Sequence, residues 1–278
     1  MKLQSQEVKQ TNRWLATCLS TLLLLLTALP LYAAEFPGRD KYPGAQTISS
    51  EELHQLFKAG EAVLVDVRST MEYSVIHPVG ALHIDLSSVR FENEAQELAA
   101  KHPGKKLAFY CNGVTCMKSY EAYTRASEAG IINTLAYDAG TPDWAIKFPA
   151  DTLLLGQPIT DPNKQLISRD AFAARNISFD EFKQAAADAG SMVIDIRDHV
   201  QRSHNLPEVG GVRHIPLDNF IPNFVERKVN QDKKLLIFDQ VGRQTRWLQY
   251  YLEASGYRNY AFLKGGAVAV LGTQEYQR

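Results

Sequence analysis

An internal repeat constrains the fold more than any other feature, because a segment present twice indicates two copies of one structural unit. ISSEELHQLFKAGEAVLVDVRS begins at Ile48 and matches ISFDEFKQAAADAGSMVIDIRD, which begins at Ile177. The match continues in register through VGALHIDL with GGVRHIPL, GKKLAFYC with DKKLLIFD, and EAGIINTLAYDAG with ASGYRNYAFLKGG. We therefore predict two tandem domains, residues 47–149 and 178–278, joined by a polar linker over residues 150–177.

Each copy alternates segments typical of helices with segments typical of buried strands. Both copies open with a serine followed three residues later by glutamate, the pattern of a helix N-terminal capping box, and both helices are predicted to end at a glycine. Short, continuous apolar runs follow, as expected for a parallel sheet covered on both faces. The predicted strands of the first copy are Val63–Val67, Leu107–Tyr110 and Thr134–Tyr137, and a helix is predicted over residues 119–130. We therefore expect an α/β fold in which each copy has a central, mainly parallel sheet flanked by helices.

The N-terminal residues have the pattern of an export signal. Basic residues precede an apolar stretch that includes an unbroken leucine run, Leu22–Leu26, and Pro30 ends it. Small residues at Ala33 and Ala34 offer a cleavage site, so we predict a signal peptide over residues 1–34 and a periplasmic or secreted mature protein. The alternative is an uncleaved membrane anchor, because the stretch approaches the length of a membrane span. Contact with a membrane is expected only in that case.

Charge and cysteine content narrow the functional classes. The formal net charge is -1, so nucleic acid is not an expected partner. Cys18 lies in the predicted signal, which leaves Cys111 and Cys116 in the mature chain. Two cysteines are too few for a disulfide scaffold or a structural zinc site, and we expect no metal or organic cofactor.

The loop that follows Tyr110 is the strongest candidate for an active site. Sites in open α/β sheets form at the carboxyl ends of strands, and Cys111 occupies such an end. A loop that leads into a helix N-terminus can turn its backbone N–H groups inward and bind an anion. The same field is expected to lower the pKa of the Cys111 thiol. The predicted substrate-binding residues of this loop are Asn112, Gly113, Val114, Thr115, Cys116 and Lys118.

The chain resembles the rhodanese (thiosulfate sulfurtransferase) family. The resemblance covers both copies and depends on DVR at Asp66, EYSVIHPVGALHIDL from Glu72, the YC dipeptide before a glycine-containing loop, and AGTPDW from Ala139. It implies that Cys111 takes a sulfane sulfur from a small anionic donor such as thiosulfate, holds it as a persulfide and passes it to a thiol acceptor. Asp66 and Arg68 are expected to anchor loops beside the site.

The sequence departs from the family pattern in both copies. The first loop is about two residues longer than the usual one, since Ser119 stands eight residues after Cys111. The second loop, DQVGRQT, keeps the usual spacing but begins with Asp239, which cannot carry a persulfide. We therefore expect the second domain to be inactive.

Several alternatives remain at this point. Cys116 could be a small packing residue, a persulfide acceptor or a disulfide partner of Cys111. The whole protein could be a thiol redox protein that uses this pair, or a non-catalytic rhodanese-like binding module. A cysteine-dependent phosphatase is disfavoured, because position 117 is Met117 where that chemistry needs an arginine.

Overall fold

The computed structural model describes residues 36–202 and 204–272. The predicted signal peptide, residues 1–34, lies outside the described residues. The chain divides into two compact units, Met1–Pro37 and Gly38–Arg278, and both copies of the repeat lie in the second. Over the described residues, no helix combines the length and the apolar character that a membrane crossing needs.

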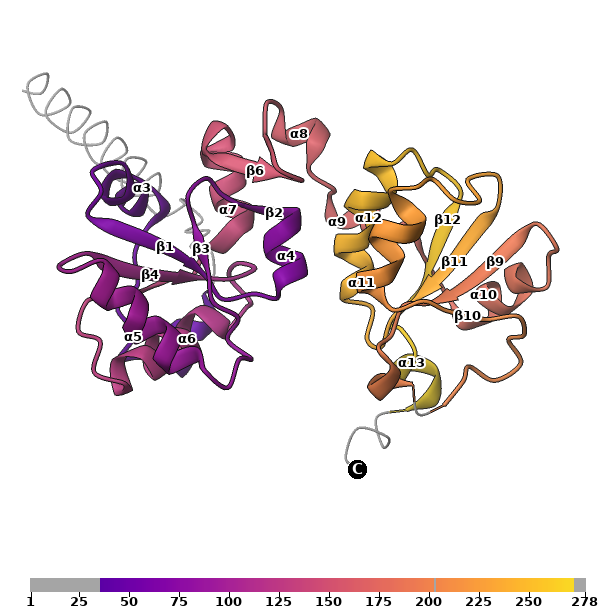
Figure 1. The fold of residues 1–278 in the computed structure, drawn as a ribbon, viewed down its shortest axis with the longest axis horizontal. Coiled ribbons are helices and arrows are strands. Elements are labelled where there is room, and N and C mark those ends of the chain that lie inside the picture. The colour runs from indigo at the N-terminus through magenta and orange to yellow at the C-terminus, as the bar shows by residue number, and fades with distance from the viewer. Residues whose placement is uncertain (1–35, 203, 273–278) are drawn as a thin grey trace, which may run out of the picture. The chain divides into compact units, whose positions relative to one another are not determined.

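The first copy of the repeat is a four-stranded parallel sheet with helices on both faces (Figure 1). The strand order is β3-β1-β4-β5, and a single parallel bridge from Thr47 to Ala136 extends the sheet at β5. All three predicted strands are present, within one residue of the expected bounds. The elements of this copy are α2 (Pro37–Lys41), α3 (Ser50–Lys58), β1 (Ala62–Asp66), α4 (Thr70–Val75), β2 (Ile76–Pro78), β3 (Leu82–His83), α5 (Phe91–Lys101), β4 (Lys106–Tyr110), α6 (Lys118–Glu128), β5 (Thr134–Tyr137) and α7 (Gly140–Lys147).

Two apolar layers cover the sheet of the first copy, because successive side chains of a strand point to opposite faces. Val63 and Val65 of β1 pack with the buried residues of α5 and α6 on one face. Leu64 packs with Leu53 of α3 and Trp144 of α7 on the other. This two-sided burial explains why the strands are continuous apolar runs rather than alternating ones.

The second copy repeats this architecture with one more strand. Its sheet has the order β10-β9-β11-β12-β8, and every pair in it is parallel. The strand β8 pairs with β12 at the position where Thr47 bridges to β5 in the first copy. The elements are β8 (Asn176–Ile177), α10 (Phe179–Ala186), β9 (Ser191–Asp195), η2 (His199–Gln201), β10 (Arg213–His214), α11 (Leu217–Phe220), the π-helical turn η3 (Ile221–Val225), β11 (Lys234–Phe238), α12 (Gln244–Ala254), β12 (Tyr260–Leu263) and α13 (Val268–Leu271).

The segment predicted as a polar linker, residues 150–177, carries regular structure. Its strand β6 pairs antiparallel with β2 of the first copy and with β7, and its last strand, β8, joins the sheet of the second copy. It is therefore divided between the two copies rather than extended as a free connection. Its elements before β8 are η1 (Pro149–Asp151), β6 (Thr152–Leu154), β7 (Gln157–Pro158), α8 (Pro162–Gln165) and α9 (Arg169–Ala173).

The two predicted capping boxes differ in completeness. Ser178 and Glu181 form the full reciprocal box at the start of α10. At α3 only one half is present, in which the Ser49 hydroxyl accepts from the backbone N–H of Glu52.

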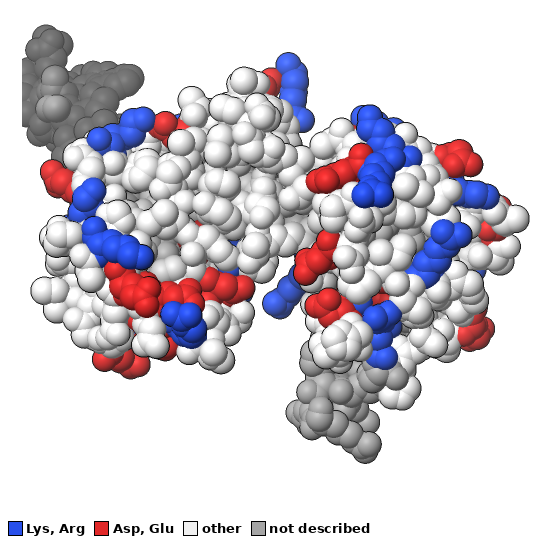
Figure 2. Space-filling model, in the orientation of Figure 1, with Lys and Arg blue, Asp and Glu red and all other residues white. Residues whose placement is uncertain are grey.

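On the face of the molecule drawn in Figure 2, acidic and basic side chains lie beside one another on both copies.

Candidate active site

Cys111 lies at the carboxyl edge of the first sheet, directly after the strand β4. β4 ends at Tyr110, Cys111 is the next residue, and α6 begins at Lys118. Gly113 has a φ of 104°, a conformation that favours glycine, and its carbonyl accepts a 2.8 Å hydrogen bond from the Cys116 N–H. This turn folds the loop back, so that the two cysteines share one small loop at the start of a helix.

The loop brings the two cysteines together in one buried cluster. Cys111 is fully buried, and Cys116, which is partly buried, packs against the same apolar cluster. The Cys111 thiol lies 3.5 Å from the Cys116 carbonyl oxygen and 3.7 Å from the Ser119 hydroxyl. Both cysteines are free thiols in the structure.

The prediction that the loop lowers the pKa of Cys111 is wrong, and the lowered pKa belongs to Cys116. Burial raises the pKa of Cys111, and the hydrogen bond and charge of Cys116 raise it further. The pKa of Cys116 falls to about 6, first because Cys111 donates to its sulfur, and then through the backbone amides of Asn112 and Lys118 and the Lys118 ammonium. The loop therefore stabilises one negative charge, which the pair shares and which rests mainly on Cys116.

We expect alkylation of the reduced protein by iodoacetamide to follow an apparent pKa of about 6, with Cys116 as the residue modified. Because the thiolate is the nucleophile, the rate should fall about tenfold for each pH unit below that midpoint and level off above it. Rates measured from pH 4 to 9, with the labelled peptide identified by mass, test this. The Cys116→Ser variant is the control, and a wild-type midpoint in the ordinary thiol range would contradict the assignment.

The other predicted loop residues take different positions. The Asn112 side chain turns away from the sulfurs, accepts a 3.2 Å hydrogen bond from Arg68 and donates to Glu72. Val114 is partly exposed and Thr115 is exposed. Lys118, the first residue of α6, acts on the charge of Cys116 rather than on that of Cys111.

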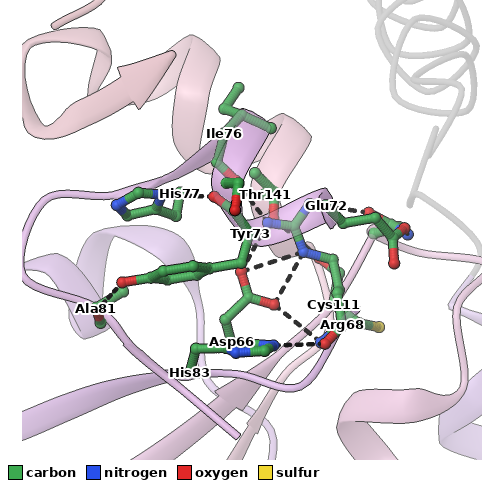
Figure 3. A network of polar contacts seen from close by, with 12 residues as sticks. Asp66, Arg68, Glu72, Tyr73, Ile76, His77, Ala81, His83, Cys111 and Thr141 are labelled. Atoms are coloured by element: carbon green, nitrogen blue, oxygen red, sulfur yellow. Dashed lines mark hydrogen bonds and ion pairs between the residues drawn. The ribbon is translucent and has the colours of Figure 1, made fainter. Parts of the chain in front are cut away.

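Asp66 and Arg68 form a buried ion pair behind the loop. Both side chains have no exposed surface, and their closest N–O distance is 2.6 Å. Figure 3 shows the Arg68 guanidinium lying across the Asp66 carboxylate, and the same guanidinium donates a 2.6 Å hydrogen bond to the carbonyl of Ile76. Through Asn112 this network connects the end of β1 to the second residue of the cysteine loop.

Glu72 is a site residue that sequence reasoning missed. It completes a capping box with Ser69 at the start of α4, and its second carboxylate oxygen accepts from Asn112. One side chain therefore fixes both a helix start and the cysteine loop. The signal for it was present, because Ser69 and Glu72 stand at capping-box spacing.

Aromatic stacking orders the segment that follows Glu72. The ring of Tyr73 stacks on His77 and on His83, with centroid distances of 4.0 and 5.0 Å, and its hydroxyl donates to the carbonyl of Ala81. His83 Nε2 lies 2.8 Å from the carbonyl oxygen of Arg68 (Figure 3). These contacts hold the chain after Arg68 in place, which gives the YSVIHPVGALH stretch a structural role.

Gly140 and Thr141, at the start of α7, support the loop from the other side. The backbone N–H and the hydroxyl of Thr141 both donate to the Cys111 carbonyl, at 3.0 and 3.2 Å. Gly140 has a φ of 65°, and a Cβ at this position would collide with the Cys111 carbonyl oxygen and the Gly113 nitrogen. The close approach of these two backbones explains the glycine of the AGTPDW segment.

In the second copy the loop after β11 also turns backbone N–H groups inward, and this cradle of amides binds the side chain of Asp239. Asp239 follows β11 and is buried, and its carboxylate accepts from the backbone N–H groups of Gly242, Gln244 and Thr245, the last two at 2.6 and 3.2 Å. Burial raises the pKa of Asp239, and these amides oppose that rise. The carboxylate of Asp239 therefore already occupies the position at which these amides could bind an anion.

Replacing Asp239 by alanine should lower the free energy of unfolding of the second copy by about 2 kcal/mol, because three loop amides lose their acceptor. Denaturant titrations monitored by fluorescence measure this change. Asp239→Asn, which keeps one acceptor oxygen, should lose less. Equal stability of wild type and Asp239→Ala would show that the amides are not held by the carboxylate.

Over residues 36–202 and 204–272, no group of three or more histidine, cysteine, aspartate or glutamate side chains could hold a metal ion.

Comparison with known proteins gives matches over parts of the chain. A curated relative, the HTH-type transcriptional regulator Rv0324 of Mycobacterium tuberculosis, is 31% identical over 99 residues, which are 36% of this chain and 41% of that protein. The chain thus matches less than half the length of this relative. The human single-domain sulfurtransferase TSTD1 is 29% identical, with a TM-score of 0.31, over 37% of this chain and 98% of that structure. The thiosulfate sulfurtransferase from Pseudomonas aeruginosa is 19% identical, with a TM-score of 0.35, over 84% of this chain and 47% of that one.

The family model described as the rhodanese-like domain matches residues 49–147 and again residues 178–272. The two matches follow the two copies found in the sequence, and together they cover more than half of the chain. The protein therefore belongs to the rhodanese-like domain family and carries two such domains in tandem.

Proposed function

We propose that the protein is a sulfurtransferase in which Cys111 carries the transferred sulfur as a persulfide. The observation that carries the proposal is the placement of Cys111 directly after β4, where a loop and the start of α6 stabilise a thiolate shared with Cys116. Membership of the rhodanese-like family supports the same chemistry. The second domain, with Asp239 in its cradle, has no sulfur at this position.

The reaction begins when Cys111 attacks the outer sulfur of a small anionic donor such as thiosulfate. Cys111 reacts as the thiolate, the form in which the negative charge that the two cysteines share rests on its own sulfur. The sulfur–sulfur bond of the donor breaks, sulfite leaves with the bonding electron pair, and the Cys111 persulfide remains. A thiol acceptor then removes the sulfane sulfur.

The persulfide can be tested by the intact mass of the full-length protein after it is reduced, freed of reductant and treated with thiosulfate. The variant Cys116→Ser is expected to gain one sulfur atom, because loss of the neighbouring negative charge also removes a cause of the raised Cys111 pKa. Cys111→Ser, with Cys116 intact, should release no sulfite and gain no mass. Sulfur addition or cyanide-dependent turnover in Cys111→Ser would exclude Cys111 as the carrier.

We also propose that residues 1–34 direct export, so that the enzyme acts in the periplasm or outside the cell. The proposal depends on the charged, apolar and small-residue segments of this stretch. N-terminal sequencing of the exported protein tests it, with an expected start close to Glu35.

A further inference from the structure

Cys116 is the nucleophile that the structure places closest to the proposed persulfide. The Cys111 sulfur is fully buried, and the Cys116 carbonyl and the Ser119 hydroxyl lie within hydrogen-bonding distance of it. Cys116 packs against the buried cluster that contains Cys111, and its carbonyl lies 3.5 Å from the Cys111 sulfur. An acceptor from solution must first enter this buried site, whereas Cys116 already lies in it.

The loop also favours the charged form that such a nucleophile needs. In the free-thiol form the hydrogen bond with Cys111 is the largest cause that lowers the pKa of Cys116 to about 6, followed by the backbone amides of Asn112 and Lys118 and the Lys118 ammonium. The amides and the ammonium are still present once Cys111 carries sulfur, so they continue to favour the thiolate form of Cys116 beside the sulfur that is to be released. Ordinary thiols are mainly protonated at neutral pH, so a free acceptor has a smaller reactive fraction.

We propose that Cys116 attacks the inner sulfur of the Cys111 persulfide, forms a Cys111–Cys116 disulfide and expels hydrosulfide. This inference rests on the proposed function, since it starts from the persulfide. The bond between the two persulfide sulfurs breaks, and its electron pair leaves with the outer sulfur. The sulfane sulfur is reduced to sulfide, the two cysteines are oxidised, and no external oxidant is needed. The overall single turnover converts thiosulfate into sulfite and sulfide.

A second turnover requires reduction of the disulfide, which we assign to a dithiol reductant. Such a reductant attacks one sulfur of the disulfide, forms its own internal disulfide and returns both cysteines as thiols. The domain then acts as a dithiol-dependent thiosulfate reductase. This activity is distinct from transfer of the sulfur to cyanide or to a thiol acceptor.

The test is a single-turnover experiment on full-length protein, without oxygen and without added thiol, with one equivalent of thiosulfate. In the wild type we expect one sulfite and one sulfide per chain, and a product lighter than the reduced protein by two hydrogen atoms. In Cys116→Ser we expect one sulfite, no sulfide and a gain of one sulfur atom. An equimolar mixture of Cys111→Ser and Cys116→Ser carries both thiols on separate chains and should release no sulfide.

The outcomes separate this inference from the proposed function. If neither the wild type nor Cys116→Ser releases sulfite, the persulfide chemistry itself fails. If Cys116→Ser gains sulfur and the wild type keeps the same added sulfur without releasing sulfide, only the present inference is overturned. Peptide mapping that places the added sulfur on Cys116 of the wild type would also overturn it, because it shows attack on the outer sulfur. Release of sulfide by the mixed variants would contradict the intramolecular step.

Discussion

Replacing Arg68 by alanine is expected to lower the free energy of unfolding of the first domain by about 3–5 kcal/mol, because the change leaves a buried carboxylate without its partner. Asp66 has no exposed surface, and Arg68 is its only ion-pair partner among the described residues. The change also removes hydrogen bonds to Ile76 and to Asn112. Urea titrations of the full-length protein, followed by circular dichroism, measure the loss.

The second domain supplies a matched control. Its Asp195 pairs with Arg197 at 2.9 Å in the same way, but His214 Nδ1 also lies 3.0 Å from the Asp195 carboxylate. Arg197→Ala therefore leaves Asp195 with a partner, and we expect a smaller loss of stability and full sulfur transfer at Cys111. Equal losses in the two variants would show that the histidine contact contributes nothing.

A second control separates burial of charge from loss of packing. When both members of a buried pair are replaced by apolar residues of similar size, the cost is often small. The double variant Asp66→Leu/Arg68→Met should therefore be more stable than Arg68→Ala. If it is less stable, the main contribution of Arg68 is its hydrogen bonds to the backbone and to the loop.

Replacing Gly140 by alanine should lower the rate of sulfur transfer about 100-fold, because a displacement of the reacting group on the order of 1 Å can have this effect. The added Cβ would overlap the Cys111 carbonyl and the Gly113 nitrogen, and a φ of 65° is unfavourable for alanine. The loop must move to accept it, and the hydrogen bonds from Thr141 to Cys111 would break. Steady-state thiosulfate and cyanide assays measure the change.

The control for Gly140→Ala is the same substitution at Gly266 in the second domain. Gly266 also has a φ of 65°, and a Cβ there would lie 2.6 Å from the Val241 nitrogen. The two variants should lose comparable stability, but only Gly140→Ala should lose activity. Comparable activity losses in both variants would show that the effect comes from general destabilisation and not from the position of the Cys111 loop.

The sequence was sufficient to predict the strands β1, β4 and β5, because the signal of each does not depend on its neighbours. These runs are mainly apolar, and the duplication doubled the information on each. The two-residue strands β7 and β8 are too short to produce a periodic pattern, so the segment that contains them was predicted as a linker.

The spacing of the loops was also predictable, whereas the electrostatics of the thiols was not. Ser119 and Thr245 are both the second residue of a helix, which confirms that the first loop is two residues longer. The pKa values depend on burial and on the contact between the two sulfurs, and neither can be read from a single loop sequence. The contact between Gly140 and Cys111 joins residues far apart in the chain, so it could not be predicted from the sequence.

The complete burial of Cys111 has a kinetic consequence for any reagent that approaches it. The sulfur presents no surface to solvent, so the segment between Asn112 and Lys118 must move away from it before a donor can reach it. That opening sets an upper limit on the speed of capture, however concentrated the donor. The opening also selects donors by size, since a compact ion needs a narrower passage than a bulky disulfide reagent. Such a disulfide reagent should therefore modify only Cys116, which is more accessible.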